Sequence, residues 1–176
     1  MLSGPVIKSS FPPVADARTR VLILGSLPGE LSLSRAQYYA HPRNQFWRLM
    51  QAVIGTELAS LPYPARLAAL TDAGVGLWDV IGSAERRGSL DTAIRNHQAN
   101  ALAEFAASLP ALRAVAFNGG KASGIGRRLL DEARGFEQVT LPSSSPAYTL
   151  SLERKALQWL PLRAFLEPGD PPRAPV

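Results

Sequence analysis

The sequence contains no cysteine and only two histidines, His41 and His97. Without cysteine the chain forms no disulfide, iron–sulfur cluster or thiolate metal site. Two histidines far apart in the sequence, with no carboxylate cluster beside either of them, make a poor metal site. We therefore expect a protein that uses neither a metal nor another cofactor.

The sequence also lacks a long apolar run. No segment approaches the ~20 consecutive apolar residues of a membrane span, and residues 1–20 lack the apolar segment of a signal peptide. We therefore expect a cytoplasmic protein without a membrane partner. The length of 176 residues suits one domain, which we place at 20–166, between an N-terminal arm (1–19) and a proline-rich tail (167–176). We expect a monomer, although no sequence feature bears directly on the oligomeric state.

Lysine is scarce. Lys8, Lys121 and Lys155 are the only three, so arginine supplies most of the 19 basic residues. The formal net charge is +5 and the isoelectric point is about 10.1. Arginine dominance is compatible with phosphate contacts, but a high-GC coding bias explains it equally well. The charge alone favours a nucleic-acid partner only slightly.

Short apolar runs alternate with helical patterns along the chain. The predicted strands are residues 21–24, 75–80, 113–117 and 136–141, and the predicted helices are residues 44–54, 65–73, 99–108, 121–133 and 151–165. Such alternation is typical of a parallel sheet between two helical layers. We therefore predict an α/β fold, a three-layer α/β/α sandwich with a central, mostly parallel four-stranded sheet.

Small polar residues follow three of the predicted strands. The first strand leads into Gly25-Ser26-Leu27-Pro28-Gly29, the third into Asn118, and the fourth into residues 142–145. The carboxyl ends of parallel strands meet at one edge of a sheet, where ligands bind in open α/β folds. Amides, hydroxyls and backbone N–H groups suit the recognition of a flat neutral base by hydrogen bonding and stacking.

The segment after the first turn is dense in aromatic and polar side chains. It includes QYYAHPRNQFW at residues 37–47, in which Pro42 favours an extended crossing before a helix that starts near Asn44. Two interpretations stay open for this run. Its aromatic side chains either belong to the core or face a ligand, and Asn44 either caps the helix or serves a site.

Residues 81–97 are too polar for a core element and predict a long surface loop. The segment includes Arg86, Arg87 and Asp91. Because long loops beside the carboxyl ends of strands often carry function, we consider it a segment that faces DNA or rims the pocket. A solvated charged loop explains the same composition equally well.

Three motifs in order, GSLPG…QYYAHPRNQFW, FNGGKA (117–122) and LPSSSPAY (141–148), resemble the uracil-DNA glycosylase superfamily. Within it the chain is most similar to the hypoxanthine (deoxyinosine) DNA glycosylases, and the resemblance extends from about residue 11 to residue 165. It implies the uracil-DNA glycosylase-like fold and an enzyme of base excision repair. Such an enzyme flips a deaminated base out of DNA and hydrolyses its N-glycosidic bond. Hypoxanthine is the first candidate base, and uracil and xanthine are the others.

The resemblance also implies roles for individual residues. Asn44 is the catalytic candidate, as a group that orients water or a base substituent, because a neutral amide is no strong base. Ser26 stands where relatives carry Asp or Asn, a departure from their pattern, and we keep it as a second candidate. The implied substrate-binding residues are Gly25, Leu27, Pro28, Gly29, Tyr39, Phe46, Asn118 and Ser143. The implied DNA-binding residues are Ser144, Ser145, Pro146, Ala147 and Tyr148, in a loop whose serine N–H groups can hold phosphates beside the flipped nucleotide. We add Arg43, Arg86 and Arg87, because a surface rich in arginine is expected to contact several phosphates.

In this assignment Phe46 stacks on the flipped base and Asn118 reads its edge. Core packing is the alternative for Phe46, and a turn before two glycines is the alternative for Asn118. We further expect base excision without strand cleavage, because Lys121 is the only lysine near a strand end and no motif contains a well-supported amine nucleophile.

A non-catalytic module that binds a nucleotide or another phosphate compound is the competing function. The GSLPG turn has neither the GxGxxG nor the GxxxxGK[ST] spacing, which weakens this alternative. A scaffold protein with an incidental α/β fold is a further alternative, but it leaves the QYYAHPRNQFW cluster unexplained.

Overall fold

The computed structural model describes residues 4–169, so residues 1–3 of the predicted arm and 170–176 of the predicted tail lie outside the described residues. Within this range the strands are β1 (Ile7–Ser9), β2 (Val21–Gly25), β3 (Val75–Asp79), β4 (Ile81–Glu85), β5 (Arg95–Ala99), β6 (Ala114–Asn118) and β7 (Glu137–Leu141). The helices are α1 (Glu30–Arg35), α2 (Phe46–Ile54), α3 (Tyr63–Asp72), α4 (Leu102–Ala107), α5 (Gly120–Leu129), α6 (Leu152–Trp159) and α7 (Arg163–Leu166), with 3-10 turns η1 (Asp91–Ala93) and η2 (Leu160–Leu162).

The central sheet has four strands in the order β3-β2-β6-β7, and all of its pairings are parallel. Strand β2 lies in the middle and is buried along its whole length, as its uninterrupted apolar run predicts. The predicted α/β sandwich with a four-stranded parallel sheet is confirmed.

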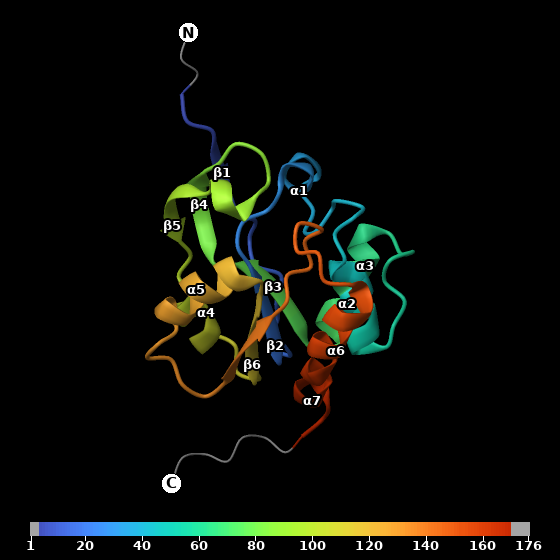
Figure 1. Ribbon diagram of the computed structural model, residues 1–176. Helices are drawn as coiled ribbons and strands as arrows, with labels where there is room; N and C mark the ends of the chain where they lie inside the picture. Colours follow the sequence, from blue (N-terminus) through green and yellow to red (C-terminus); the bar gives the residue numbers. More distant parts are fainter. Residues whose placement is uncertain (1–3, 170–176) are drawn as a thin grey trace.

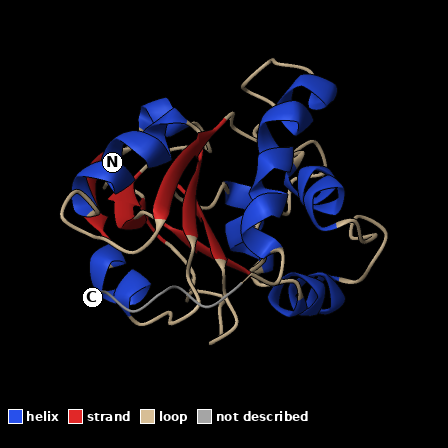
Figure 2. Ribbon diagram, turned by 90° about the horizontal axis from the view of Figure 1, so that it is seen from below, coloured by secondary structure: helices blue, strands red, loops and turns tan. Residues whose placement is uncertain are grey.

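Helices cover both faces of this sheet (Figures 1 and 2). Alternate residues of β2 enter two separate cores: Val21 and Ile23 pack with residues of α2, α3 and α6, whereas Leu22 and Leu24 pack with residues of α4 and α5. Because successive side chains of a strand point to opposite faces of the sheet, one apolar run contributes to the cores beneath both helical layers.

The second sheet is small and antiparallel, with the order β1-β4-β5 (Figure 1). The prediction of a long surface loop at residues 81–97 is therefore wrong for its two ends, which form β4 and most of β5. Strand β5 is exposed at every residue, so it carries no apolar alternation that a sequence pattern could reveal. Strand β1, in the predicted arm, was not expected from the sequence either.

Several helix boundaries differ from the predicted ones. Helix α2 starts at Phe46 rather than at residue 44, and the predicted final helix is divided into α6, η2 and α7. The division falls at Pro161, which has no N–H for a helical hydrogen bond. Helix α1 was not predicted. No helix of the described residues 4–169 is long and apolar enough to cross a membrane.

Candidate active site

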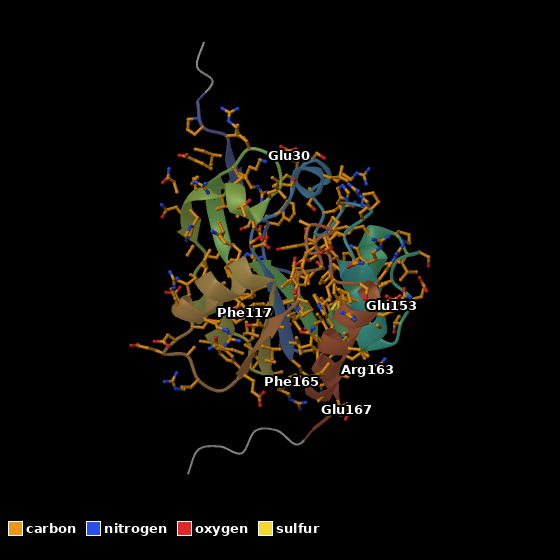
Figure 3. All side chains as sticks on the ribbon, viewed as in Figure 1. Glu30, Phe117, Glu153, Arg163, Phe165 and Glu167 are labelled. Atoms are coloured by element: carbon orange, nitrogen blue, oxygen red, sulfur yellow. The ribbon has the colours of Figure 1, made fainter. Side chains whose placement is uncertain are left out.

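A cleft of about 540 Å³ lies where the strands of the central sheet end. The structure brings together most of the residues that the sequence assigned to the site. Those that line the cleft are Gly25, Ser26, Leu27, Pro28, Gly29, Tyr39, Arg43, Asn44, Asn118, Ser143, Ser144, Ser145, Pro146, Ala147 and Tyr148. Glu30 of α1 also lines it and is labelled in Figure 3. Phe46, Arg86 and Arg87 are not among the lining residues.

Gly25 ends β2 and lets two side chains approach the backbone. A Cβ atom at this position would lie 2.6 Å from Asp79 Oδ1 and 3.0 Å from the Tyr39 hydroxyl. Any larger residue would therefore displace one of them. The next residue, Ser26, donates a hydrogen bond of 2.6 Å from its hydroxyl to Asp91 Oδ1. The turn thus also positions the side chains of Asp79, Tyr39 and Asp91.

Asn118 ends β6 and is fixed by three hydrogen bonds. Its Oδ1 accepts from the backbone N–H of Ser144 at 2.9 Å, and its Nδ2 donates to the hydroxyls of Ser144 and Tyr39, at 2.9 and 3.2 Å. The amide therefore connects the end of β6 with Tyr39 and with the loop that contains Ser144. Both of its donor hydrogens are engaged, so contact with a base edge depends on the second lone pair of Oδ1 or on an exchange of these partners.

Tyr39 lines the cleft and Phe46 does not, and this corrects the role predicted for Phe46. The Phe46 ring is fully buried and lies behind Tyr39, with the two ring centroids 3.9 Å apart and nearly parallel. Tyr39 has a positive φ of 53°, which is uncommon for a residue with a Cβ atom. Its carbonyl accepts a hydrogen bond from Trp47 Nε1 at 3.1 Å, which helps to hold this conformation.

Asn44 lines the cleft immediately before α2. Its Oδ1 accepts the backbone N–H of Phe46 at 3.0 Å, so Asn44 forms an Asx turn that leads into the helix, whose N-cap residue is Gln45. Nδ2 forms no hydrogen bond within residues 4–169. The two interpretations of Asn44 are therefore compatible, because one amide atom serves the helix and the other is available to a ligand.

The LPSSSPAY loop forms one rim of the cleft and is stabilised by its own hydrogen bonds. Ser145 N–H donates to Ser143 Oγ, and Ala147 N–H donates to Ser145 Oγ. Ser144 is buried, and its N–H already donates to Asn118. The prediction that these serine N–H groups hold phosphates is therefore corrected for Ser144 and Ser145. Tyr148 remains half exposed, with Lys155 Nζ 5.5 Å from its ring centroid.

The three arginines assigned to DNA lie in different surroundings. Arg43 is exposed at the cleft and Arg87 is exposed outside it. Arg86 is only 2% exposed and donates to the carbonyl of Pro28 under the turn. A DNA contact by Arg86 is therefore contradicted, since a buried guanidinium does not reach a phosphate. Its position stabilises the GSLPG turn instead.

Two carboxyl groups that were not assigned to the site also line the cleft, those of Asp79 and Asp91. Asp91 belongs to the segment 81–97, which we considered from the sequence as a segment that faces DNA or rims the pocket. Asp79 ends β3, and Asp91 lies in η1 between β4 and β5. Burial, and next the negative charge of Asp91, raise the pKa of Asp79 to about 7. The sequence did contain a signal for Asp79, because it is the polar residue directly after an apolar strand, as Asn118 is. The prediction extended that strand to Val80 and so placed Asp79 inside it.

Residues 4–169 contain no group of three or more His, Asp or Glu side chains that could hold a metal ion. The side chains that line the cleft offer amides, hydroxyls, aromatic rings, the carboxyl groups of Glu30, Asp79 and Asp91, and the side chains of His41 and Arg43.

The chain is similar to known proteins over most of its length. Residues 12–166 match the family model of the Uracil DNA glycosylase superfamily. Two relatives named hypoxanthine DNA glycosylase, from Methanosarcina barkeri and Methanosarcina acetivorans, are 44% and 40% identical over 86% and 88% of this chain and 95% and 96% of theirs.

A solved structure has the same fold. It is the solution NMR structure of a candidate uracil DNA glycosylase from Methanosarcina acetivorans, which is 37% identical and superposes with a TM-score of 0.82, over 92% of this chain and all of the other. Fold, motifs and family model agree with the resemblance found in the sequence. The chain belongs to the uracil DNA glycosylase superfamily.

Proposed function

We propose that the protein is a DNA glycosylase that flips a deaminated base into the cleft and hydrolyses its N-glycosidic bond, with hypoxanthine as the first substrate. One observation carries the proposal. One wall-forming set lines the cleft: the ring of Tyr39, the amides of Asn44 and Asn118, and the loop that ends in Tyr148. A flat base needs these features for stacking and hydrogen bonding.

Each of these residues has a role in the proposed reaction. Tyr39 stacks on the flipped base, in the place predicted for Phe46, and Phe46 supports its ring from behind. Asn44 Nδ2 orients the attacking water or a base substituent, because it is the unpartnered end of that amide. As the bond breaks, the base gains negative charge and the sugar gains positive charge, so donors that are already oriented stabilise the transition state.

The relatives favour hypoxanthine among the candidate bases. Two proteins that bear the name hypoxanthine DNA glycosylase align with nearly the whole chain at 40% identity or more. The prediction from the motifs named the same family. Uracil and xanthine are retained as alternative substrates, because they differ from hypoxanthine in hydrogen-bonding groups that a cleft of this size can accommodate.

Labelled DNA duplexes that carry hypoxanthine, uracil or xanthine test the proposal. After incubation with the protein, alkali converts abasic sites into strand breaks, and we expect breaks at hypoxanthine. Without alkali the strand should stay intact, and borohydride should trap no covalent adduct, because no lysine lines the cleft. A trapped adduct would contradict the hydrolytic mechanism.

The competing function is a non-catalytic module for nucleotides or other phosphate compounds. A comparison of binding to a hypoxanthine duplex with binding to free nucleotides separates the two, since such a module prefers the free nucleotide. The cytoplasmic location, the monomeric state, the independence of metals and the division into arm, domain and tail remain predictions from the sequence. Size-exclusion chromatography tests the monomeric state, and activity in the presence of a chelator tests the independence of metals.

A further inference from the structure

Asp79 is a buried carboxyl group that the proposed mechanism leaves unused. It ends β3, lines the cleft, and is 4% exposed. Its Oδ2 is buried and has no hydrogen-bond partner. An unsatisfied buried carboxylate is costly, so such a group in a wall of a cleft calls for an explanation.

The groups around Asp79 do not neutralise it by direct pairing. Asp91 of η1 adds a negative charge, and Arg86, from the segment after β4, adds a positive one. The Arg86 guanidinium, however, donates to the Pro28 carbonyl, and its Nε and Nη1 have no partner. Tyr38 and Tyr39 face the same carboxyl group, and burial raises the pKa of both hydroxyls. Both tyrosines are therefore neutral donors at physiological pH.

Asp91 and Asp79 differ in their surroundings. Asp91 is partly exposed and accepts the hydroxyl of Ser26, which suits a carboxylate. Asp79 is desolvated and lies beside Asp91, and both conditions favour its protonated form. Two carboxyl groups in one site that differ in this way are the usual arrangement of an acid and an acceptor. A protonated Asp79 is a hydrogen-bond donor in the wall of the cleft.

We propose that Asp79 is a further catalytic residue, which contacts the flipped purine and transfers a proton to its N7 as the base leaves. The inference rests on the proposed function. In this step the electron pair of the N9–C1′ bond passes to the purine, and the proton of Asp79 neutralises it at N7. Water then adds to C1′ and releases one proton, which restores the acid form of Asp79, so the sum is hydrolysis.

This role suits a purine better than a pyrimidine. Hypoxanthine carries N7 in the ring that is attached to the sugar, so protonation there weakens the glycosidic bond directly. Uracil has no such atom. Transfer of a proton to the leaving group typically contributes 10²–10⁴-fold to a rate. Asp79 thus accounts for a preference for hypoxanthine that the neutral amides of the cleft do not by themselves provide.

The test compares the wild type and Asp79→Asn in single turnovers on duplexes with hypoxanthine and with 7-deazahypoxanthine, which lacks N7. Asparagine keeps the shape and a hydrogen-bond donor but cannot give up a proton. We expect the variant to bind hypoxanthine DNA normally and to excise the base about 10²-fold more slowly. On 7-deazahypoxanthine the wild type should be slow, and the variant should be no slower than the wild type.

The pH dependence gives a second readout. The wild-type rate should fall as the pH rises through the pKa of Asp79, and this limb should be missing in Asp79→Asn. Asp131→Asn, an exposed aspartate far from the cleft, is the matched control and should retain the wild-type profile. A melting curve for each variant excludes unfolding as the cause of a slow rate.

The outcomes are distinguishable from those of the proposed function. A wild type that excises no base overturns both the function and this inference. A wild type that excises hypoxanthine, together with an Asp79→Asn variant of unchanged rate, overturns the inference alone. An equal loss on hypoxanthine and on 7-deazahypoxanthine overturns it as well, because Asp79 would then act elsewhere than at N7.

Discussion

The β3 side and the β6–β7 side of the cleft both present polar groups to a ligand, but they differ in how far these groups are already hydrogen-bonded. On the β6–β7 side, Asn118 and Ser144 are buried, and the Asn118 amide is hydrogen-bonded to Ser144 and Tyr39. On the β3 side, Asp79 is equally buried, and one of its oxygens is unpaired. This difference indicates a different role for each side of the cleft. A satisfied network fixes the shape of the site, whereas an unsatisfied group retains its capacity to bind or to exchange a proton.

Strand order explains this separation. β2 lies between β3 and β6, and its end at Gly25 and Ser26 lies between the two sides. Gly25 allows Asp79 and Tyr39 to approach from both sides, since a Cβ atom there would contact both. The glycine therefore keeps the carboxyl group of Asp79 and the amide of Asn118 within reach of one ligand.

The largest expected effect on stability concerns Asp79. Its pKa rises from 3.8 to about 7, so the native protein holds a proton that the unfolded chain releases between these values. We expect wild-type stability to fall as the pH rises from about 4 to about 7, by up to about 4 kcal/mol. Asp79→Asn should lack this loss, so it should be the more stable protein above pH 7 and gain nothing at pH 4.

Urea unfolding at several pH values measures this difference, with the exposed Asp131→Asn as the control that should follow the wild type. Parallel stability curves for Asp79→Asn and the wild type would show that Asp79 is ionised and satisfied in the native state. The contrast between the two sides of the cleft would then disappear.

Asn44→Ala tests the second amide that lines the cleft, the one that precedes α2. The loss of a donor that orients water or stabilises developing charge costs ~10²–10³ in rate, about 3–4 kcal/mol. Because Oδ1 also accepts the Phe46 N–H, we expect a loss of about 1 kcal/mol in stability as well. Single-turnover kinetics and a melting curve on the same variant separate the two effects.

Asn44→Ser sharpens this test, since a serine hydroxyl retains an acceptor for this N–H but lacks the Nδ2 donor. We expect wild-type stability and a slow rate like that of the alanine variant. Normal turnover by the serine variant would show that Asn44 has a structural role only.

The predictions from the sequence were most accurate for features that depend on the local sequence alone. The buried run of β2 and the polar residues after β2, β6 and β7 lie where the pattern placed them, because apolar continuity and strand ends are local properties. It was wrong where burial decides a role. Phe46 and Tyr39 are both aromatic and seven residues apart, and only packing shows which of them faces the cleft. The sequence likewise suggests that Arg86 lies on the surface, but in the structure it is buried beneath the GSLPG turn.

Tyr39 joins the two sides, since its hydroxyl accepts from Asn118 and lies near Asp79. Tyr39→Leu should weaken the binding of hypoxanthine DNA by about 1–3 kcal/mol, the typical contribution of one base–aromatic stack. Tyr39→Phe keeps the ring and should bind within a few-fold of the wild type. Titration of labelled duplexes measures both, and equal losses in the two variants would indicate that the hydroxyl, rather than the ring, contacts the base.

The smallest expected effect concerns the rim of the cleft, where we expect the DNA backbone to bind. Each arginine–phosphate contact releases counterions, so the logarithm of the binding constant should fall steeply with the logarithm of salt concentration. Arg43 is exposed at the cleft, and Arg43→Gln should reduce the slope by about 1. Arg134, which is exposed between α5 and β7, is the matched control, and Arg134→Gln should leave the slope unchanged. Equal slopes for both variants would mean that DNA crosses the protein away from Arg43. A flat plot for the wild type would mean that this face does not bind DNA through its phosphates.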